Sequence, residues 1–258
     1  MKTKAGSEME LGGEAELTQE IDRLTAELAR REREAAANAL QLEHYAADLR
    51  ETFKQERARS RELTRSYRAT VRALCNAVEA RDAYTAEHAS RVAAYAIEIG
   101  RVLGLPRPDA PEIEFGFLLH DIGKVAIPDS ILYKPGALTD RERELMARHP
   151  AVGAEIMRGI EFLEEAAKVV RSHHERWDGT GYPDGLIGEQ IPIAARVFAV
   201  ADVLDALTTD RPYRPAFTLR EAREMILAGS GSHFDPRVVK AFDSIDDGTL
   251  QSIGAMTK

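Results

Sequence analysis

The sequence predicts an all-α protein, with a long N-terminal helix that precedes a helical bundle. Apolar residues recur at helical spacing along most of the 258 residues, and the sequence contains no convincing strand pair and no internal repeat. The composition is 44% hydrophobic and 30% charged, which provides enough apolar material for a folded core. A chain of this length can therefore form one sizeable domain with an extension.

The N-terminal part has the pattern of a coiled coil. Apolar residues follow one another at spacings of four, three and four residues, as in a coiled-coil seam: Leu17, Ile21, Leu24 and Leu28. No Gly or Pro interrupts the chain from Glu14 to Arg81, although the segment 30–34 is charged on all sides and weakens the seam. We expect one long helix here, and the alternative is a solvated single helix.

This pattern divides the chain into three predicted segments. Residues 1–14 form a flexible N-terminus, residues 15–74 form a coiled coil that joins two copies in a homodimer, and residues 75–258 form the folded domain. Cys75 lies beside Leu74 on the apolar side of the helix, which predicts a core position for its thiol.

The folded domain is predicted to be a succession of helices with recognisable ends. Gly104 ends the first helix, Thr139 and Glu142 form a capping box, and Pro150 suits a first helical turn. The segment 175–192 holds four Gly and two Pro, and a loop of this length inside a compact domain is usually functional. The expected helices lie at about 86–103, 111–119, 139–149, 150–157, 161–174, 193–209, 219–228 and 236–242.

Composition and charge argue against several classes of protein. The sequence has no run of about 18 apolar residues, which a membrane-spanning helix needs, and its first residues lack the apolar core of a signal peptide. Cys75 is the only cysteine, so no internal disulfide can form. Residues 71–258 carry 22 basic and 29 acidic residues without a basic stripe. We therefore expect a cytoplasmic protein that binds neither membranes nor nucleic-acid polymers.

Two carboxylates lie in a segment that should be buried. Residues 193–208 are apolar on nearly every side, yet Asp202 and Asp205 share one face of this predicted helix. A buried unpaired carboxylate costs several kcal/mol or becomes protonated. A positive group must therefore lie beside this face, either an arginine or, as the histidines indicate, a metal ion.

Five histidines lie at predicted buried faces or helix junctions: His88, His120, His149, His173 and His174. A single one of them would most simply be a hydrogen-bonded core residue. Five of them together with two aspartates match the imidazole and carboxylate ligands of Mn, Fe or Zn hydrolytic sites. Asp121 directly follows His120, and such an aspartate can bridge the two ions that hydrolysis of phosphate esters uses.

At these residues the sequence resembles the HD-GYP family, a subgroup of the HD-domain metal-dependent phosphohydrolases. The resemblance covers roughly residues 75–243 and leaves the first 70 residues outside. It rests on long motifs in consistent order: YTAEHASRV, LLHDIGKVAIPDSIL, KPGALT, RHPAVGAEI, HHERWDGTGYPDGLIGEQIP, ADVLDALTTDRPYR and GSHFDP. It implies that the bundle is of the HD type and that residues 75–258 form an HD-GYP catalytic domain.

The resemblance also implies a binuclear metal centre, with Fe or Mn as the expected ions. One ion would be held by four side chains, namely His88, His120, Asp121 and Asp202. Asp121 would bridge to a second ion, held by His149, His173 and His174. The implied reaction is hydrolysis of cyclic di-GMP, by attack of a metal-bridging hydroxide on a phosphodiester.

Further residues are implied around the substrate. Asp121 and Lys124 are the expected catalytic residues, and Lys124 would also meet a phosphate oxygen or a metal-bound water. Asp205 would support or orient the site, and is grouped with the substrate-binding residues. The remaining expected substrate contacts are the GYP triplet and two arginines: Gly181, Tyr182, Pro183, Arg211 and Arg214.

The sequence departs from the family pattern at one position. Some members carry Glu four residues before the first metal histidine, where it serves a third metal, and this chain has Tyr84 there. A phenol is a poor ligand for a hard divalent ion, so we expect two metals. By analogy, hydrolysis is expected to favour linear pGpG over full conversion to GMP.

Two other functions stay open from the sequence. One is an HD-type phosphohydrolase for another cyclic dinucleotide or nucleotide, and the other is a non-catalytic module that binds cyclic di-GMP or a partner protein. The GYP loop and the complete set of metal positions favour the phosphodiesterase. An upstream sensor or regulatory protein is the expected source of a signal through the N-terminal helix.

Overall fold

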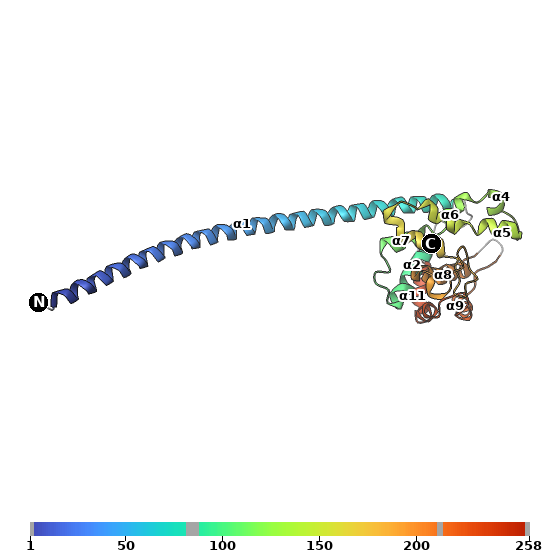
Figure 1. The fold of residues 1–258 in the computed structure, drawn as a ribbon. Helices are drawn as coiled ribbons and strands as arrows, with labels where there is room; N and C mark the ends of the chain where they lie inside the picture. Colours follow the sequence, from blue (N-terminus) through green and yellow to red (C-terminus); the bar gives the residue numbers. More distant parts are fainter. Residues whose placement is uncertain (1–2, 81–87, 211–213, 256–258) are drawn as a thin grey trace. The chain divides into compact units, whose positions relative to one another are not determined.

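The computed structural model describes the backbone of residues 3–80, 88–210 and 214–255, and the side chains of this range from residue 17 on, Glu79 excepted. The N-terminal helix α1 is continuous from Thr3 to Glu79 (Figure 1), so the predicted long helix is confirmed. It begins before the predicted coiled coil, within the segment that was expected to be flexible. The chain divides into two compact units, Met1–Leu63 and Thr64–Lys258.

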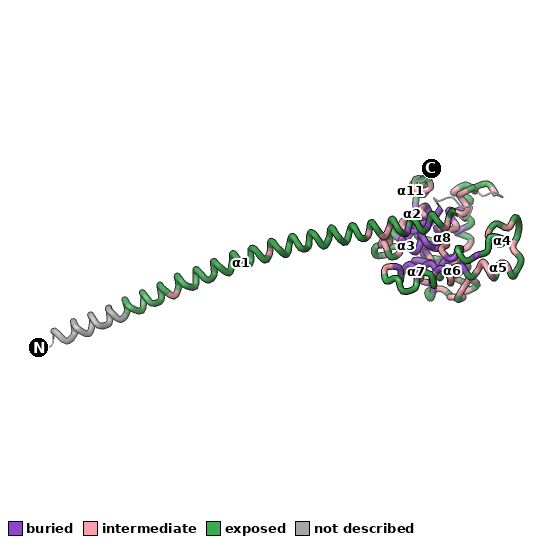
Figure 2. Tube along the Cα trace, turned by 90° about the horizontal axis from the view of Figure 1, so that it is seen from above, coloured by how far each residue is buried: buried purple, intermediate pink, exposed green. Residues whose placement is uncertain are grey.

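The first unit consists of a single helix on which nearly all residues are exposed from residue 17 on (Figure 2). The apolar seam residues are as open as the charged ones, and Ile21 is 60% exposed. Ion pairs three or four residues apart support the helix, for example Arg23–Glu20 at 2.7 Å and Arg31–Glu27 at 2.8 Å. None of the helices in the described residues combines the length and apolar character that a membrane crossing requires.

The second unit is a helical bundle, and within the described residues it contains no strand, only an isolated bridge between Ser230 and Phe234. The all-α prediction is therefore confirmed. After the last turns of α1, its helices are α2 (His88–Leu103), α3 (Pro111–Leu118), η1 (Ile122–Ala126), α4 (Asp129–Leu132), α5 (Asp140–Met146), α6 (His149–Ile156), η2 (Glu161–Leu163), α7 (Glu164–Ser172), η3 (Gly188–Gln190), α8 (Ile193–Thr208), α9 (Leu219–Ala228), α10 (Pro236–Asp243) and α11 (Asp247–Ala255).

The predicted helix starts are observed at their capping residues. The Thr139 side chain accepts a hydrogen bond from the Glu142 backbone N–H. The Glu142 carboxylate in turn accepts one from the Thr139 backbone N–H at 2.7 Å. Thr218 and Glu221 form a second capping box at α9. The elements η1, α4, η3 and α11 were not predicted. The first three are short turns without a periodic apolar pattern.

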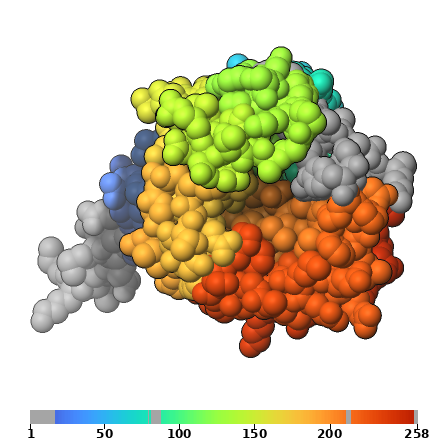
Figure 3. Space-filling model, turned by 90° about the vertical axis from the view of Figure 1, so that its right-hand side faces the viewer, coloured from blue at the N-terminus to red at the C-terminus, as the bar shows by residue number. Residues whose placement is uncertain are grey.

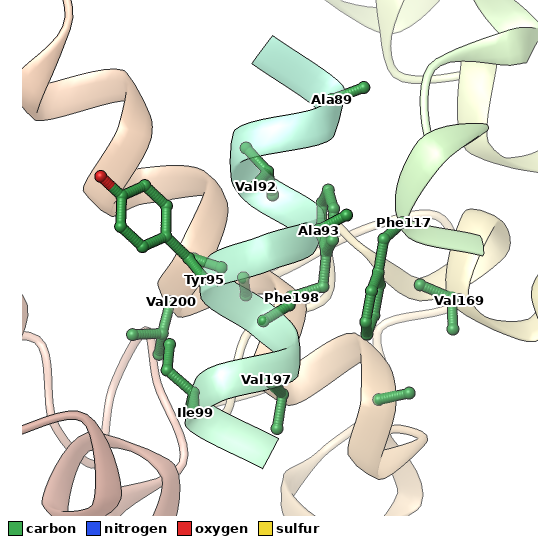
Figure 4. Close-up of a cluster of buried hydrophobic side chains, with 14 of the residues drawn as sticks. Ala89, Val92, Ala93, Tyr95, Ile99, Phe117, Val169, Val197, Phe198 and Val200 are labelled. Atoms are coloured by element: carbon green, nitrogen blue, oxygen red, sulfur yellow. The ribbon is translucent and has the colours of Figure 1, made fainter. Parts of the chain in front are cut away.

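The core of the second unit surrounds α2, which packs against α8 and α3 (Figure 4). Val92 and Ile99 on α2 are fully buried, as is Phe198 on α8. Phe198 stacks on Phe117 of α3, with ring centroids 5.7 Å apart. This apolar centre holds together three parts of the bundle: α2, which carries His88, α8, which carries Asp202, and the end of α3.

The last turns of α1 belong to this core. Val71 is 1% exposed and Cys75 is buried, as predicted, whereas Leu74 points outward. Tyr67 stacks on Phe162 at 4.1 Å between ring centroids. The predicted boundary after residue 74 therefore falls inside α1, and the compact unit starts eleven residues before the predicted start at residue 75, at Thr64.

Two neighbouring residues of α9 provide a matched test of this core. Ile226 is fully buried and Met225 is 44% exposed. We expect Ile226→Ala to lower the free energy of unfolding by about 2–5 kcal/mol, because it removes packed methyl groups and leaves a cavity. Met225→Ala should change it by less than about 0.5 kcal/mol. Urea unfolding followed by circular dichroism compares the two variants, and equal losses would contradict the core assignment.

Candidate metal centre

The histidines and aspartates that the sequence singled out come together in two groups inside the second unit. Ligand atoms of His88, His120 and Asp202 all lie within 4.8 Å of one another, and so do those of His149, His173 and His174. Four of the histidines are buried, and His174 and Asp202 are partly open. The two groups are formed by α2, α8, α6 and the segments that follow α3 and α7.

Three of the rings are oriented by the backbone of their own helical turn. The Nδ1 atoms of His120, His149 and His173 lie 2.7–3.0 Å from the carbonyl oxygen three residues earlier, on Phe117, Met146 and Val170 respectively. A carbonyl only accepts, so each Nδ1 carries the proton and each Nε2 presents a lone pair. This is the tautomer that a metal ligand requires.

These lone pairs point at one another, which is an unusual arrangement for unprotonated nitrogens. The Nε2 atoms of His149 and His173 are only 3.2 Å apart, and the ring of His174 lies 4.2 Å from that of His173. Two facing acceptors repel unless a proton or a cation lies between them. The donor set therefore fits a divalent ion in this position.

The structure corrects the expected local conformation of His173 and His174. They were expected on the helix 161–174, but α7 ends at Ser172 and His173 is its C-cap. The chain turns away from the helix at this point. The turn allows both successive rings to face the centre, whereas adjacent residues within a helix point in different directions.

Asp121 lies between the two groups. One of its oxygens is 3.0 Å from His120 Nε2, and the other is 3.3 Å from His149 Nε2. Lys124 Nζ lies 2.8 Å from the first oxygen. The carboxylate thus has the position that a ligand shared by two ions requires.

The two aspartates of α8 have different partners. Asp202 Oδ1 lies 3.3 Å from His88 Nε2 and belongs to the first group. Asp205 is 1% exposed and binds the fork of Arg91, with its Oδ1 2.6 Å from Nε. Of the two positive groups that the sequence left open, an arginine or a metal ion, the one beside Asp205 is an arginine. Asp205 is enclosed and lies on the Nδ1 side of the His88 ring.

Burial and neighbouring charges shift the pKa values of the centre. Burial lowers the pKa of His174 to about 4, and burial with three neighbouring histidines holds that of His173 well below its usual range. Burial would raise the pKa of Asp202, but its hydrogen bond with His88 outweighs this and lowers it to about 2. Burial disfavours protonated His88, yet hydrogen bonds to Asp202 and Asp205 raise its pKa to about 10. Two of the three histidines of the second group, His173 and His174, therefore stay neutral, as ligands must be.

The loop 175–192 brings Tyr182 to the histidines. The Tyr182 ring lies 4.9 Å from the His174 ring. A Cβ atom at Gly181 would approach the Arg176 backbone nitrogen to 2.4 Å, so the loop can pass here only with glycine. Burial, with Asp121 and Asp202 nearby, raises the pKa of Tyr182 to about 12, and its hydroxyl remains a donor.

Glu175 fixes this loop from within, and the sequence reasoning missed it. The residue is 3% exposed, and its two oxygens accept the backbone N–H groups of Asp184 at 2.7 Å and Leu186 at 3.0 Å. Its position at the start of a Gly/Pro-rich loop was a usable signal, because such a loop has backbone donors that helices and strands do not satisfy.

The outer part of the loop is tied to the segment before α10. Trp177 N–H donates to the carbonyl of His233, and Asp178 N–H donates to that of Ser232. His233 therefore contributes its backbone carbonyl to the support of the loop. A cavity of about 490 Å³ lies between Tyr182 and α5, and Figure 3 shows the surface hollowed below the green α4–α5 segment.

Arg211 and Tyr84 lie outside the described residues. Arg214 donates to the carbonyl of Ala206 at 2.6 Å and lies over the Phe217 ring. The structure thus places its guanidinium at the C-terminal end of α8, where it satisfies otherwise open carbonyls.

Comparison with known proteins identifies relatives of this chain. The model of the HD domain family matches residues 42–238. The cyclic di-GMP phosphodiesterase response regulator RpfG of Xanthomonas campestris is 46% identical over 176 residues, which are 67% of this chain and 47% of that protein. The 3'3'-cGAMP-specific phosphodiesterase 2 of Vibrio cholerae is 42% identical over 195 residues, or 75% of this chain and 35% of that protein. The chain thus spans less than half the length of these two relatives.

A solved structure supports the fold. The crystal structure of a cyclic GMP-AMP-specific phosphodiesterase of Vibrio cholerae superposes with a TM-score of 0.55 at 24% identity, covering 72% of this chain and 50% of that one. The family model covers more than half of the chain and includes both ligand groups and the GYP loop. This chain therefore belongs to the HD domain family and, with its GYP triplet in the loop beside the histidines, to the HD-GYP group within it.

Proposed function

We propose that this chain is a metal-dependent phosphodiesterase that hydrolyses cyclic di-GMP. The observation that carries the proposal is the set of histidine Nε2 lone pairs that converge on Asp121 from two sides. In this assignment His88, His120 and Asp202 hold one divalent ion, and three histidines hold the other, namely His149, His173 and His174. Asp121 is shared by both, and Fe or Mn suits this mixture of imidazole and carboxylate.

Two bound ions would supply Lewis-acid polarisation of the phosphoryl group and stabilise its developing negative charge. The residues of the chain position the ester. Lys124 is 19% exposed at the side chain and directed at Asp121, so it can donate to a phosphate oxygen beside the centre. Tyr182 keeps its proton and presents a hydroxyl from the loop side. Phe198 is fully buried and its ring lies 4.8 Å from that of His120. It therefore excludes water from the core side of the centre.

Lys124 is the cation that we assign to substrate phosphate first. Arg214 is engaged with the end of α8, and Arg211 remains a prediction from the sequence. We assign Gly181 and Pro183 to the shape of the loop, and Tyr182 to the substrate. Asp205 has a supporting role, because its oxygens are used by Arg91 and His88.

A second substrate is favoured by one observation. Of the two relatives described above, the one that matches the larger share of this chain acts, by its name, on 3'3'-cGAMP. The two cyclic dinucleotides share a phosphodiester ring and differ in one base, so the metal centre alone does not distinguish them. Turnover of both compounds by the same preparation decides between them.

We also propose that two ions suffice and that pGpG is the main product. Tyr84 stands where a carboxylate would serve a third ion, and a neutral phenol binds hard divalent ions poorly. A rate of GMP formation that equals the rate of pGpG formation would contradict this.

The exposed seam of α1 supports a further proposal, a homodimer that carries a signal from an upstream partner. Leu17, Ile21, Leu24 and Leu28 are each more than half exposed. Burying this stripe against a second copy would remove apolar surface from water at about 25 cal/mol per Å². The signal would then travel along the helix whose last turns form part of the second unit's core.

Replacement of the shared ligand tests the metal centre. We expect His120→Ala and Asp121→Ala to lose at least about 10³-fold in cyclic di-GMP turnover and to bind less metal, because each removes a ligand. Product is resolved as pGpG and GMP by chromatography with Mn(II) or anaerobic Fe(II), and bound metal is measured by mass spectrometry. His44→Ala on the exposed part of α1 is the control and should behave as the wild type. Full turnover by Asp121→Ala would refute the proposed centre.

The loop buttress is tested by Glu175→Gln. The amide keeps one acceptor and loses the other, so one backbone N–H of the loop is left without its partner, at a cost of about 1–3 kcal/mol. We expect KM for cyclic di-GMP to rise about tenfold, while metal content stays at the wild-type value. Glu189→Gln changes a loop glutamate that is 73% exposed at the side chain, and it serves as the matched control. An unchanged KM in Glu175→Gln would show that the loop does not need this carboxylate.

The dimer proposal is tested on the full chain by charge placed in the seam. Leu42 lies 14 residues after Leu28, two heptads further along the same seam. The double substitution Leu28→Glu and Leu42→Glu should yield a monomer in multi-angle light scattering, because carboxylates would face each other across the seam. Leu40 is 58% exposed but lies off the seam, so Leu40→Glu should leave the mass unchanged. A dimer that survives the double substitution would place the interface elsewhere.

A further inference from the structure

Arg91 is a buried arginine with a defined partner in the second unit. It lies on α2, three residues after His88, and is 9% exposed. Its Nε donates to Asp205 Oδ1 at 2.6 Å and its Nη2 donates to Asp205 Oδ2 at 3.0 Å. This is the bidentate fork geometry that arginine provides and lysine does not. Both oxygens of the carboxylate are therefore fixed in position.

The same carboxylate holds the ring of His88. Asp205 Oδ2 lies 2.7 Å from His88 Nδ1, so one oxygen is bound by both the arginine and the imidazole. The opposite nitrogen of this ring, Nε2, lies 3.3 Å from Asp202 Oδ1 in the first ligand group. The rotation of the ring is thus set by a chain of two contacts that starts at Arg91.

His88 differs in this respect from the other oriented rings. His120, His149 and His173 are held by backbone carbonyls of their own turns. Among the histidines whose Nδ1 partners the structure describes, His88 is the one held by a side chain. A side chain can rotate unless it is itself fixed, and Arg91 supplies this second attachment.

The arrangement also fixes α2 against α8. His88 and Arg91 are three residues apart on α2, and Asp202 and Asp205 are three residues apart on α8, so each pair shares one helix face. Arg91 Nη2 further reaches Thr209 Oγ1 at 3.4 Å, just beyond the end of α8. Two contacts between side chains, His88–Asp202 and Arg91–Asp205, therefore join the helices beside the metal centre.

We propose that Arg91 is a positioning residue for the first ion, acting through Asp205 on His88. This inference rests on the proposed metal centre but not on the choice of substrate. An outer partner of a histidine ligand typically contributes 10–100-fold to metal affinity, because it fixes the ring and its tautomer. Loss of the guanidinium fork should weaken the ion held by His88 and leave the ion held by His149 in place.

The test measures Mn²⁺ binding to the full chain, with free Mn²⁺ followed by electron paramagnetic resonance during titration. We expect Arg91→Gln to show one site weakened about 10–100-fold and one site at wild-type affinity. Arg91→Lys should lie between the two, because lysine keeps the charge and makes a single contact. Asp205→Asn should weaken the same site as Arg91→Gln.

A matched control separates metal positioning from loss of stability. Arg196 pairs with Asp235 at 2.7 Å, and their side chains are 9% and 0% exposed, close to the 10% and 1% of Arg91 and Asp205. Arg196→Gln should lower the thermal unfolding midpoint about as much as Arg91→Gln, while both Mn²⁺ affinities stay at wild-type values. Equal Mn²⁺ affinities in the two variants would overturn the positioning role of Arg91.

The outcomes also separate this inference from the proposed function. A wild type that binds two Mn²⁺ but does not hydrolyse cyclic di-GMP would refute the substrate, and a weakened site in Arg91→Gln would still uphold the role of Arg91. Wild-type hydrolysis with unchanged Mn²⁺ binding in Arg91→Gln would refute the role of Arg91 alone. A wild type that binds no Mn²⁺ would overturn both.

Discussion

The second unit depends on one electrostatic constraint: imidazole lone pairs and carboxylates must converge inside an apolar bundle. Histidine Nε2 atoms as close as 3.2 Å repel one another without a cation, and buried carboxylates need positive partners. The fold satisfies this constraint from both sides. Phe117, Phe198 and α2 pack in the core and hold the groups together. Backbone carbonyls fix three of the histidine rings, and Arg91 fixes the His88 ring through Asp205.

The sequence predicted most of this arrangement, because the relevant signals are local. Helical spacing and capping boxes located the main helices, and polar residues in apolar segments located His120, Asp202 and Asp205. Residues near one another in the chain, such as His120 and Asp121, could be assigned together. The division of the five histidines between two ions, however, came from the resemblance to a family and not from spacing.

What the sequence could not predict depends on contacts between distant residues. Asp205 and Arg91 are 114 positions apart, so only the packing of α2 on α8 shows that an arginine neutralises this carboxylate. Glu175 was missed because its partners are backbone N–H groups of a loop, which the sequence indicates only indirectly, through the Gly and Pro residues that follow it. The end of α7 before His173 was also missed, since no Gly or Pro marks it: the first after Val170 is Gly179.

The carbonyl anchors of His120, His149 and His173 have a consequence for sequence variation. Every residue type has a backbone carbonyl, so the anchors depend on the backbone at Phe117, Met146 and Val170 and not on the type of side chain there. The side chains of Phe117 and Val170 are constrained separately, by their burial in the core. The loop that contains Tyr182 can vary independently, because its supports at Glu175 and His233 are separate from these anchors. Side-chain changes in this loop can therefore leave the backbone anchors of the three histidine rings intact.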